Sequence, residues 1–98
     1  MICLKVYRKG TDVLVAACDE DIVGKTFRSK DLKITVSEGF YKGESGDEDV
    51  LVNRLEMATI ANLVGEKTLE IAVRRGFVDP GCILKIGGVP HAQMTRMI

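Results

Sequence analysis

Three stretches in the first part of the chain have strand-like patterns of hydrophobic and polar residues. The alternation in ICLKVYR (2–8) is typical of a half-buried strand, in which successive side chains point to opposite faces. The turn KGTD (9–12) leads from it into the more apolar VLVAACD (13–19), so these two stretches predict a β-hairpin. LKITVSE (32–38) alternates again and predicts a third strand, whereas the polar segment 19–31 follows no single period.

A glycine-rich loop, GFYKGESGDED (39–49), separates these strands from a region with helical spacing. Ser45 and Glu48 have the S-x-x-E spacing of a capping box, and the acidic residues around Glu48 favour a helix start because they complement the helix dipole. Gly65 is a natural helix stop. The helix predicted between these points has one side at 3.6-residue spacing, made of Leu51, Leu55, Ala58 and Asn62.

A second helix is predicted over residues 66–75. Arg74 and Arg75 complement the negative end of its dipole, and Gly76 followed by Phe77 is the pattern of a left-handed C-cap with its hydrophobic contact. The rest of the chain predicts a turn at DPG (79–81), a strand at CILKI (82–86) and a short edge strand in the tail AQMTRMI (92–98).

Strands at both ends of the chain with two helices between them indicate the fold class. We expect an α+β protein, a two-layer α/β sandwich in which two helices cover one face of a mainly antiparallel sheet. A chain of 98 residues suffices for one hydrophobic core and not for two. Residues 1–98 are therefore expected to form a single domain.

Composition is typical of a globular protein. Hydrophobic residues make up 46% and charged residues 29%, which is not the balance of a disordered chain. No apolar run approaches the roughly 18 residues that span a bilayer, and the N-terminus MICLKVYRKG lacks the pattern of a signal peptide. These features predict a cytoplasmic protein without a membrane-spanning segment.

Charge is balanced over the whole chain but uneven along it. The 14 basic and 14 acidic residues give a formal net charge of zero. Residues 1–33 carry seven basic and five acidic side chains, residues 34–66 carry two and seven, and residues 67–98 carry five and two, so the segments have net charges of +2, −5 and +3. The sequence therefore permits separate basic and acidic surfaces, although a domain that binds phosphates is usually basic overall.

The cysteines and the single histidine are poor material for a metal or cofactor site. Cys3, Cys18 and Cys82 are odd in number and far apart, without a CxxC pair, so neither a disulfide framework nor a zinc finger is expected. Each lies in a strand-like stretch, where a free cysteine usually acts as a small core residue. We therefore expect no metal and no cofactor.

Gly24-Lys25-Thr26 resembles only the end of a phosphate-binding P-loop. The full motif needs a glycine five residues before Gly24, where this chain has Asp19, and a helix afterwards, where FRSKD is not helical. Nucleotide hydrolysis is therefore not expected. Lys25 is instead predicted to contact phosphates together with Arg28, Lys30, Lys33 and Lys85.

Two segments contain residue types suited to binding. In GFYKGE (39–44), the rings of Phe40 and Tyr41 would either stack on bases or a partner, or close the edge of the core, and Glu44 follows them. Asn62 and Glu66 flank the turn expected between the two helices, where Asn62 would either bind a ligand or cap a helix end.

His91 and Gln93 lie in GGVPHAQ (87–93), where two glycines and a proline precede the only histidine. His91 is expected to form a hydrogen bond within its own turn, to bind a ligand, or to act in catalysis. A nucleophilic dyad would need a partner for His91, and Cys18 or Cys82 would serve if the fold brought either one close.

Four blocks, VAACDEDIVGKTF, VSEGFYKGE, ATIANLVGE and IGGVPHAQ, occur in an order and spacing that resemble the archaeal domain-of-unknown-function family 424. The resemblance covers essentially the whole chain. It implies a small stand-alone archaeal protein with a two-layer α/β sandwich fold, and some members of that family are described as predicted RNA-binding proteins. The motif positions fall on Asp19, Gly24, Lys25, Phe40, Tyr41, Gly43, Glu44, Asn62, Gly65, Glu66, Gly87, Gly88, Pro90, His91 and Gln93.

These observations lead to one preferred function and two rivals. We expect a non-enzymatic module that binds RNA or a ribonucleoprotein partner, with Tyr41 stacking and with His91 and Gln93 forming hydrogen bonds. One rival is a small-molecule binder or small enzyme that uses His91 as acid or base beside Glu44 or Glu66. The other is a protein–protein adaptor, which would form a homodimer if it self-associated through the tail strand. The segments GFYKGE, NLVGE and GVPHAQ are predicted to converge around His91.

Overall fold

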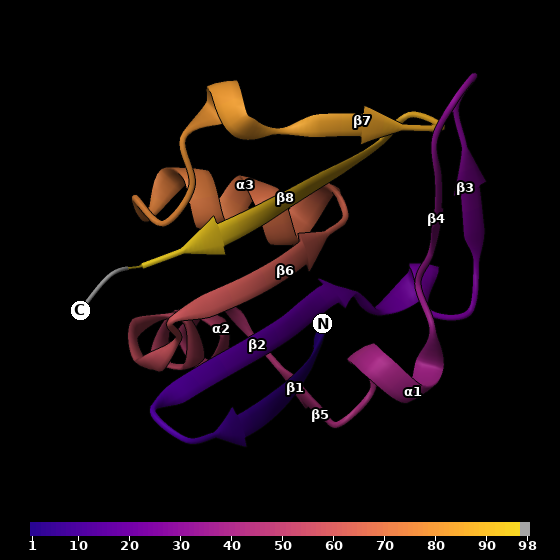
Figure 1. Ribbon diagram of the computed structural model, residues 1–98. Coiled ribbons are helices and arrows are strands. Elements are labelled where there is room, and N and C mark those ends of the chain that lie inside the picture. The colour runs from indigo at the N-terminus through magenta and orange to yellow at the C-terminus, as the bar shows by residue number, and fades with distance from the viewer. Residues whose placement is uncertain (97–98) are drawn as a thin grey trace.

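The computed structural model describes residues 1–96 (Figure 1). None of the helices in this part of the chain is long and apolar enough to cross a membrane. The strands are β1 (Ile2–Lys9), β2 (Asp12–Asp19), β3 (Thr26–Arg28), β4 (Lys33–Thr35), β5 (Glu44–Gly46), β6 (Ile60–Val64), β7 (Leu84–Ile86) and β8 (Val89–Thr95). The helices are α1 (Glu38–Tyr41), α2 (Glu48–Met57) and α3 (Glu66–Arg74), with short 3-10 turns η1 (Glu20–Ile22) and η2 (Pro80–Cys82).

The main sheet has six strands in the order β5-β1-β2-β6-β8-β7. Neighbouring strands are antiparallel except for β2 and β6, which run parallel. β1 and β2 form the predicted hairpin, paired continuously from Ile2 with Asp19 to Lys9 with Asp12. The predicted α+β fold with a mainly antiparallel sheet is therefore confirmed.

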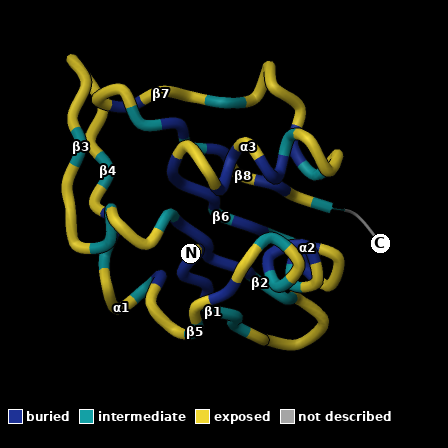
Figure 2. Tube along the Cα trace, turned by 180° about the vertical axis from the view of Figure 1, so that it is seen from behind, coloured by how far each residue is buried: buried dark blue, intermediate teal, exposed yellow. Residues whose placement is uncertain are grey.

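α2 and α3 cover one face of this sheet. Their buried residues recur at helical spacing, with Leu51 and Leu55 in α2 and Leu69 and Ala72 in α3. Buried positions gather in the middle of the molecule, while exposed positions lie mainly in the connecting loops and on the small hairpin (Figure 2). The sheet contributes alternate residues of four strands to this helix-side core, namely Ile2, Leu4, Val15, Ala17, Ala61, Leu63, Ala92 and Met94.

The helix predicted to run as far as Gly65 ends at Met57, so the second half of that prediction is wrong. Residues Ile60–Val64 form β6 instead. Within β6 the side chains of Ala61 and Leu63 enter the helix-side core, and their neighbours point the other way, as the pleat of a strand requires.

The predicted capping box at the start of α2 is also wrong. Asp47 is the N-cap, and its Oδ1 accepts a hydrogen bond from the Val50 backbone N–H at 3.1 Å. Ser45 lies in β5 and donates its hydroxyl to Glu20 Oε2 at 2.9 Å. Asp47, two residues after Ser45, therefore caps the helix in place of the serine.

α3 agrees with the helix predicted over residues 66–75. Gly76 has a φ of +81°, and the Phe77 N–H donates to the Ala72 carbonyl at 2.8 Å, as in a left-handed C-cap. The Phe77 side chain packs against the helix-side core. The predicted C-cap is therefore confirmed.

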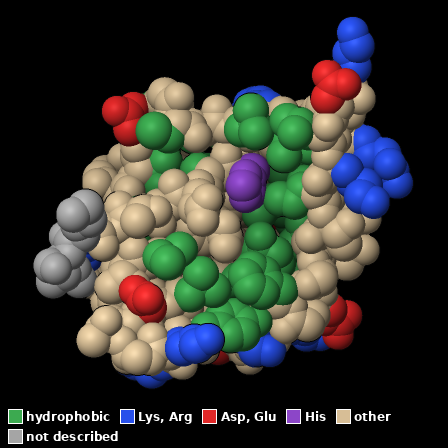
Figure 3. All heavy atoms as spheres, in the orientation of Figure 1, with side chains coloured by type: hydrophobic (Ala, Val, Ile, Leu, Met, Phe, Trp, Pro, Cys, Tyr) green, Lys and Arg blue, Asp and Glu red, His purple; other side chains and the backbone are tan. Residues whose placement is uncertain are grey.

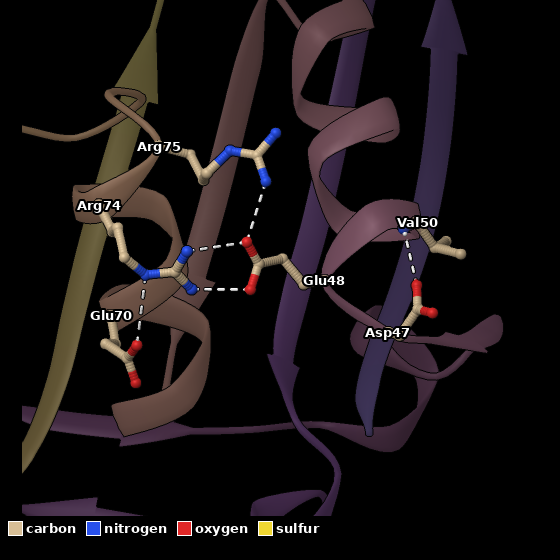
Figure 4. Close-up of polar contacts among 6 residues, drawn as sticks. All are labelled: Asp47, Glu48, Val50, Glu70, Arg74 and Arg75. Carbon is tan, nitrogen blue, oxygen red and sulfur yellow. Dashed lines mark hydrogen bonds and ion pairs between the residues drawn. The ribbon is translucent and has the colours of Figure 1, made fainter.

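Glu48 joins the start of α2 to the end of α3 (Figure 4). Its carboxylate accepts two hydrogen bonds from the Arg74 guanidinium, at 2.7 and 2.9 Å, and one from Arg75 at 2.9 Å. These bonds lower the pKa of Glu48 to about 2. The two arginines thus bind a carboxylate of α2, in addition to complementing the dipole of α3.

The opposite face of the sheet is partly covered by α1 and by the hairpin of β3 and β4. The strand predicted over 32–38 is shorter, β4, and pairs with β3 instead of joining the main sheet. The segment 19–31, which follows no period, contains η1 and β3. A second, smaller core lies beneath this cover and includes Cys3, Ala16, Cys18, Val36, Tyr41 and Val64.

β8 pairs with β6 from His91 to Thr95, but β7 pairs only with its first residues, Val89, Pro90 and His91. Residues 92–95 of the predicted tail strand therefore form a strand with a partner on one side only, as an edge strand does, although this strand begins earlier than predicted. The last residues of the predicted tail strand, 97–98, lie outside the described residues. A tight turn at Gly87 and Gly88, with φ of +59° and +82°, connects β7 to β8.

Candidate functional site

We call the face of the main sheet that points away from α2 and α3 the open face. Its residues alternate with those of the helix-side core, because successive side chains of a strand point to opposite sides. Strand register arranges them in rows across the sheet. One row is Lys5, Ala16, Asn62 and Gln93, and the next is Cys3, Cys18, Val64, His91 and Leu84.

Six residues that lie outside both core clusters are neighbours on four strands of the open face, and we call them the open patch. Leu84 is 48% exposed and adds a large apolar side chain to this surface. In Figure 3, which looks onto the open face, hydrophobic side chains lie on both sides of the only histidine. The open patch consists of Leu14, Ile60, Asn62, Leu84, His91 and Gln93.

Three polar side chains meet in the open patch. Asn62 lies directly opposite Gln93 across β6 and β8, and His91 lies two residues from Gln93 on the same side of β8. None of the three side chains forms a hydrogen bond within residues 1–96, and no buried side-chain nitrogen or oxygen there lacks a partner. Their polar atoms therefore face solvent and are available to a ligand.

His91 is half-buried in β8, outside the turn at Gly87 and Gly88. The expectation that its imidazole is hydrogen-bonded within its own turn is therefore wrong. Burial lowers the pKa of His91, which favours the neutral form of the ring. A neutral imidazole offers one N–H donor and one nitrogen acceptor.

The aromatic residues of GFYKGE do not lie as the stacking hypothesis requires. Tyr41 is only 4% exposed and belongs to the smaller core, and burial raises its pKa to about 12, so its ring is not accessible to a base. Phe40 is half-buried and stacks on Tyr7, with ring centroids 5.4 Å apart and an interplanar angle of 21°. Tyr7 also donates its hydroxyl to the Phe40 carbonyl at 2.8 Å. The aromatic surface beside the open patch is therefore the Tyr7–Phe40 pair.

Four of the five predicted phosphate contacts lie together on and beside the β3–β4 hairpin. The hairpin stands at one rim of the open face, and basic side chains project from that rim in Figure 3. Lys85 is different, because it alternates with Leu84 and Ile86 in β7 and so points away from the open face. The basic hairpin residues are Lys25, Arg28, Lys30 and Lys33, all exposed.

Glu44 and Glu66 lie away from His91, so the acid–base pairing considered for a small enzyme is wrong. Glu44 is in β5, separated from β8 by three strands, and its carboxylate forms a two-bond ion pair with Arg54, at 2.8 Å for each bond. That ion pair lowers the pKa of Glu44. Glu66 is the first residue of α3, in the layer on the other face of the sheet.

Neither cysteine considered as a nucleophile is a partner for His91. Cys18 lies in the same row but two strands away, and burial raises its pKa to about 12, the reverse of an activated thiol. Cys82 is exposed in η2, which also corrects its expected place in the core. Among residues 1–96, no group of three or more His, Cys, Asp and Glu side chains is arranged to hold a metal ion.

Two residues of the motif blocks have a clear structural role. Asp19, at the end of β2, accepts hydrogen bonds from the backbone N–H groups of Lys67 and Thr68 and from the Thr68 hydroxyl, at 2.7 to 3.0 Å. It therefore caps α3 from another part of the chain. Gly65 has a φ of +112°, and a Cβ there would lie 2.5 Å from Asp19 Cγ. Only glycine permits this approach.

The sequence also contained a signal for open-patch residues that helical spacing concealed. Leu14, Ile60 and Leu84 were not predicted as site residues, because Ile60 was assigned to a helix and the others to strands without regard to face. The segment TIANLV (59–64) is short and mainly apolar, and its β-branched residues Thr59, Ile60 and Val64 favour a strand. A strand there would have placed Ile60 and Asn62 on one face.

The fold and the site together define a class: a small α+β protein whose main sheet has one helix-covered face and one open face with solvent-facing polar groups. Within that class the chain belongs to the family described as "Protein of unknown function (DUF424)", whose model matches residues 7–97. The expected family membership is therefore confirmed. No curated protein matches the chain.

One solved structure is similar over nearly the whole chain. It is described as the crystal structure of an uncharacterized conserved protein from Methanopyrus kandleri. The two chains are 28% identical with a TM-score of 0.80, and the alignment covers 99% of this chain and 95% of the other. The similarity supports the fold described here.

Proposed function

We propose that this protein is a non-enzymatic binding module of the cytoplasm that holds a single-stranded RNA segment on the open patch. The observation that carries the proposal is the group of Asn62, His91 and Gln93, whose polar atoms face solvent from adjacent strands. Unpaired bases present hydrogen-bonding edges that such amide and imidazole groups match. A rigid sheet holds the three side chains in fixed relative positions without a ligand.

Two neighbouring features support a nucleic acid as the ligand. The half-exposed Tyr7–Phe40 pair provides an aromatic surface on the same face, in place of Tyr41. The basic hairpin lies at the rim, where its side chains can reach phosphates while bases lie on the open patch. A local group of four basic side chains also explains how a chain with zero net charge could attract a polyanion.

Partly exposed apolar residues favour a protein surface as the second candidate ligand. Leu14, Ile60 and Leu84 surround the polar group, and an apolar border of this kind is typical of protein interfaces. A ribonucleoprotein partner would use the same open patch. The adaptor hypothesis through the tail strand has its own support, because residues 92–95 of β8 pair only with β6 among the described strands.

Salt-titrated binding to short single-stranded RNA tests the proposal and separates these candidates. Contacts from the four hairpin residues predict a slope of log affinity against log salt of about −3, at about −0.7 per phosphate. Lys30→Ala and Lys33→Ala should each reduce the slope, whereas Lys67→Ala, a matched change on α3, should not. Binding driven by apolar contacts would instead show little dependence on salt.

Variants of the open patch locate the site. His91→Ala and Gln93→Ala should each weaken RNA binding about fivefold or more, corresponding to about 1–3 kcal/mol per base contact. Asn53→Ala removes an exposed amide from α2 and serves as the matched control. A folded protein that binds no RNA, or binding unaffected by His91→Ala and Gln93→Ala, would overturn the proposal.

A further inference from the structure

Cys3 and Cys18 lie directly opposite each other in the β1–β2 hairpin, with both side chains on the open-face side. Residues in this relation have Cα atoms about 4.5 to 5.5 Å apart. A disulfide bridges Cα atoms about 4.4 to 6.8 Å apart. The two thiols are free, and the backbone already holds them at a distance that a disulfide spans.

The register of the hairpin specifies the kind of pair. The Glu20 N–H donates to the Met1 carbonyl at 3.1 Å, which makes Met1 and Glu20 a hydrogen-bonded pair. Such pairs alternate along an antiparallel ladder, so Cys3 and Cys18 also form a hydrogen-bonded pair. This is the wider of the two spacings. Its Cα separation lies within the range of a disulfide, but its Cβ separation exceeds the roughly 3.5 to 4.5 Å of an unstrained one, so a disulfide formed here is strained and easily reduced.

A cleft gives access to the first of these thiols. It has a volume of about 280 Å³ and lies between η1 and the segment that leads into β5. Cys3 lines this cleft together with Glu20, Val23, Lys42 and Gly43. Cys18 is fully buried behind it. A small reagent in the cleft therefore meets Cys3 before Cys18.

We propose that Cys3 and Cys18 are an oxidisable dithiol, a modification site whose reactant is a low-molecular-weight disulfide. The Cys3 thiolate attacks one sulfur of the reagent, forming a mixed disulfide and releasing one thiolate. The Cys18 thiolate then attacks Cys3 Sγ, forming the cross-strand disulfide and releasing the second thiolate. Two protein thiols are oxidised, one reagent disulfide is reduced to two thiols, and the protons of Cys3 and Cys18 pass to solvent and to the released thiolates.

Burial raises the pKa of both thiols, so their reaction is slow at neutral pH and faster as the pH rises. Cys82 is exposed and provides an internal reference. The inference is independent of RNA binding, because the dithiol lies beneath the covered part of the open face.

The test uses the Cys82→Ser protein, in which only the buried pair remains. The folded protein is incubated with glutathione disulfide at alkaline pH, and thiol titration and intact mass are followed until they stop changing. The expected result is loss of both thiols without a glutathione adduct in the final product, reversed by a dithiol reductant. Tryptic mapping should show a peptide pair linked through Cys3 and Cys18.

Two variants distinguish the proposed order of reaction. Cys18→Ser in the Cys82→Ser protein should stop at one glutathione adduct on Cys3, whereas Cys3→Ser should react far more slowly. Circular dichroism before and after oxidation checks that each protein remains folded. Stable glutathione adducts on Cys82→Ser, or two free thiols persisting after wild-type Cys82 has reacted completely, would overturn the proposal.

Discussion

The same strands form both faces of the main sheet, but one face buries apolar side chains against the helices and the other presents polar side chains to solvent. In β6, Ala61 and Leu63 are fully buried against α2 and α3, whereas Asn62 between them points to the open face and has no hydrogen-bond partner within residues 1–96. In β8 the buried Ala92 similarly separates His91 from Gln93. Alternation thus lets one short strand stabilise the fold and present polar groups at the same time.

The largest expected difference between the faces is in stability. Leu63→Ala removes a fully buried side chain from the helix-side core and should lower the free energy of unfolding by about 3 kcal/mol. Ile60→Ala changes a half-buried side chain of the same strand on the open face and should cost less than about 1.5 kcal/mol. Urea unfolding measures both, and equal costs would show that the faces do not differ as described.

The attachment of the helix layer to the sheet gives the next largest effect. Asp19→Asn replaces a carboxylate that accepts three hydrogen bonds at the start of α3, and should cost about 1 to 2 kcal/mol. Asp21→Asn, two residues away and exposed, is the matched control and should change stability little. Urea unfolding again provides the measurement. If the two variants were equally stable, the cap from Asp19 would not contribute.

The ion pair between α2 and α3 gives the smallest effect and depends on pH. The pKa of Glu48 falls from 4.5 to about 2 in the folded state, so its contribution is fully present above pH 4.5 and is lost as the pH falls through 2. The melting temperature of Glu48→Gln should be below that of the wild type at pH 7, and the difference should shrink below pH 4.5. Because the pair faces solvent, added salt should also reduce the difference.

Glu56→Gln provides the control for this ion pair, since Glu56 is an exposed carboxylate of the same helix without an ion-pair partner among the described residues. Its melting temperature should follow that of the wild type at every pH. A Glu48→Gln difference that stays constant from pH 7 to pH 2 would contradict the assignment.

Local sequence signals correctly predicted the elements that end in a recognisable turn or capping motif. The hairpin of β1 and β2 has a clear turn between two alternating stretches, and α3 has its glycine C-cap at Gly76. The end of α2 has no such marker. Ala58 continues the helical spacing of Leu51 and Leu55, and only the β-branched residues Thr59, Ile60 and Val64 indicate a strand.

The candidate site was predicted in part. The sequence gives the residue types directly, but which face of the sheet a residue lies on depends on how distant strands pair. His91, Gln93 and Asn62 were identified from their polarity among glycines and apolar residues, and the strand order places them together. The sequence left open whether Tyr41 stacks on a ligand or closes the core, because its inward orientation depends on Ser37 capping the short helix α1 over the sheet. The pairing of β8 with β6 likewise joins segments that are far apart in the sequence.

The most direct test of the two-face account is an NMR titration of ¹⁵N-labelled protein with a short single-stranded RNA at low salt. The account predicts that the largest shift changes fall on Asn62, Leu84, His91 and Gln93 and on the β3–β4 hairpin. Amides on the outer sides of α2 and α3 should not move. Shift changes confined to the helices, or none at RNA concentrations that saturate a basic control protein, would contradict the claim that the open face is the binding surface.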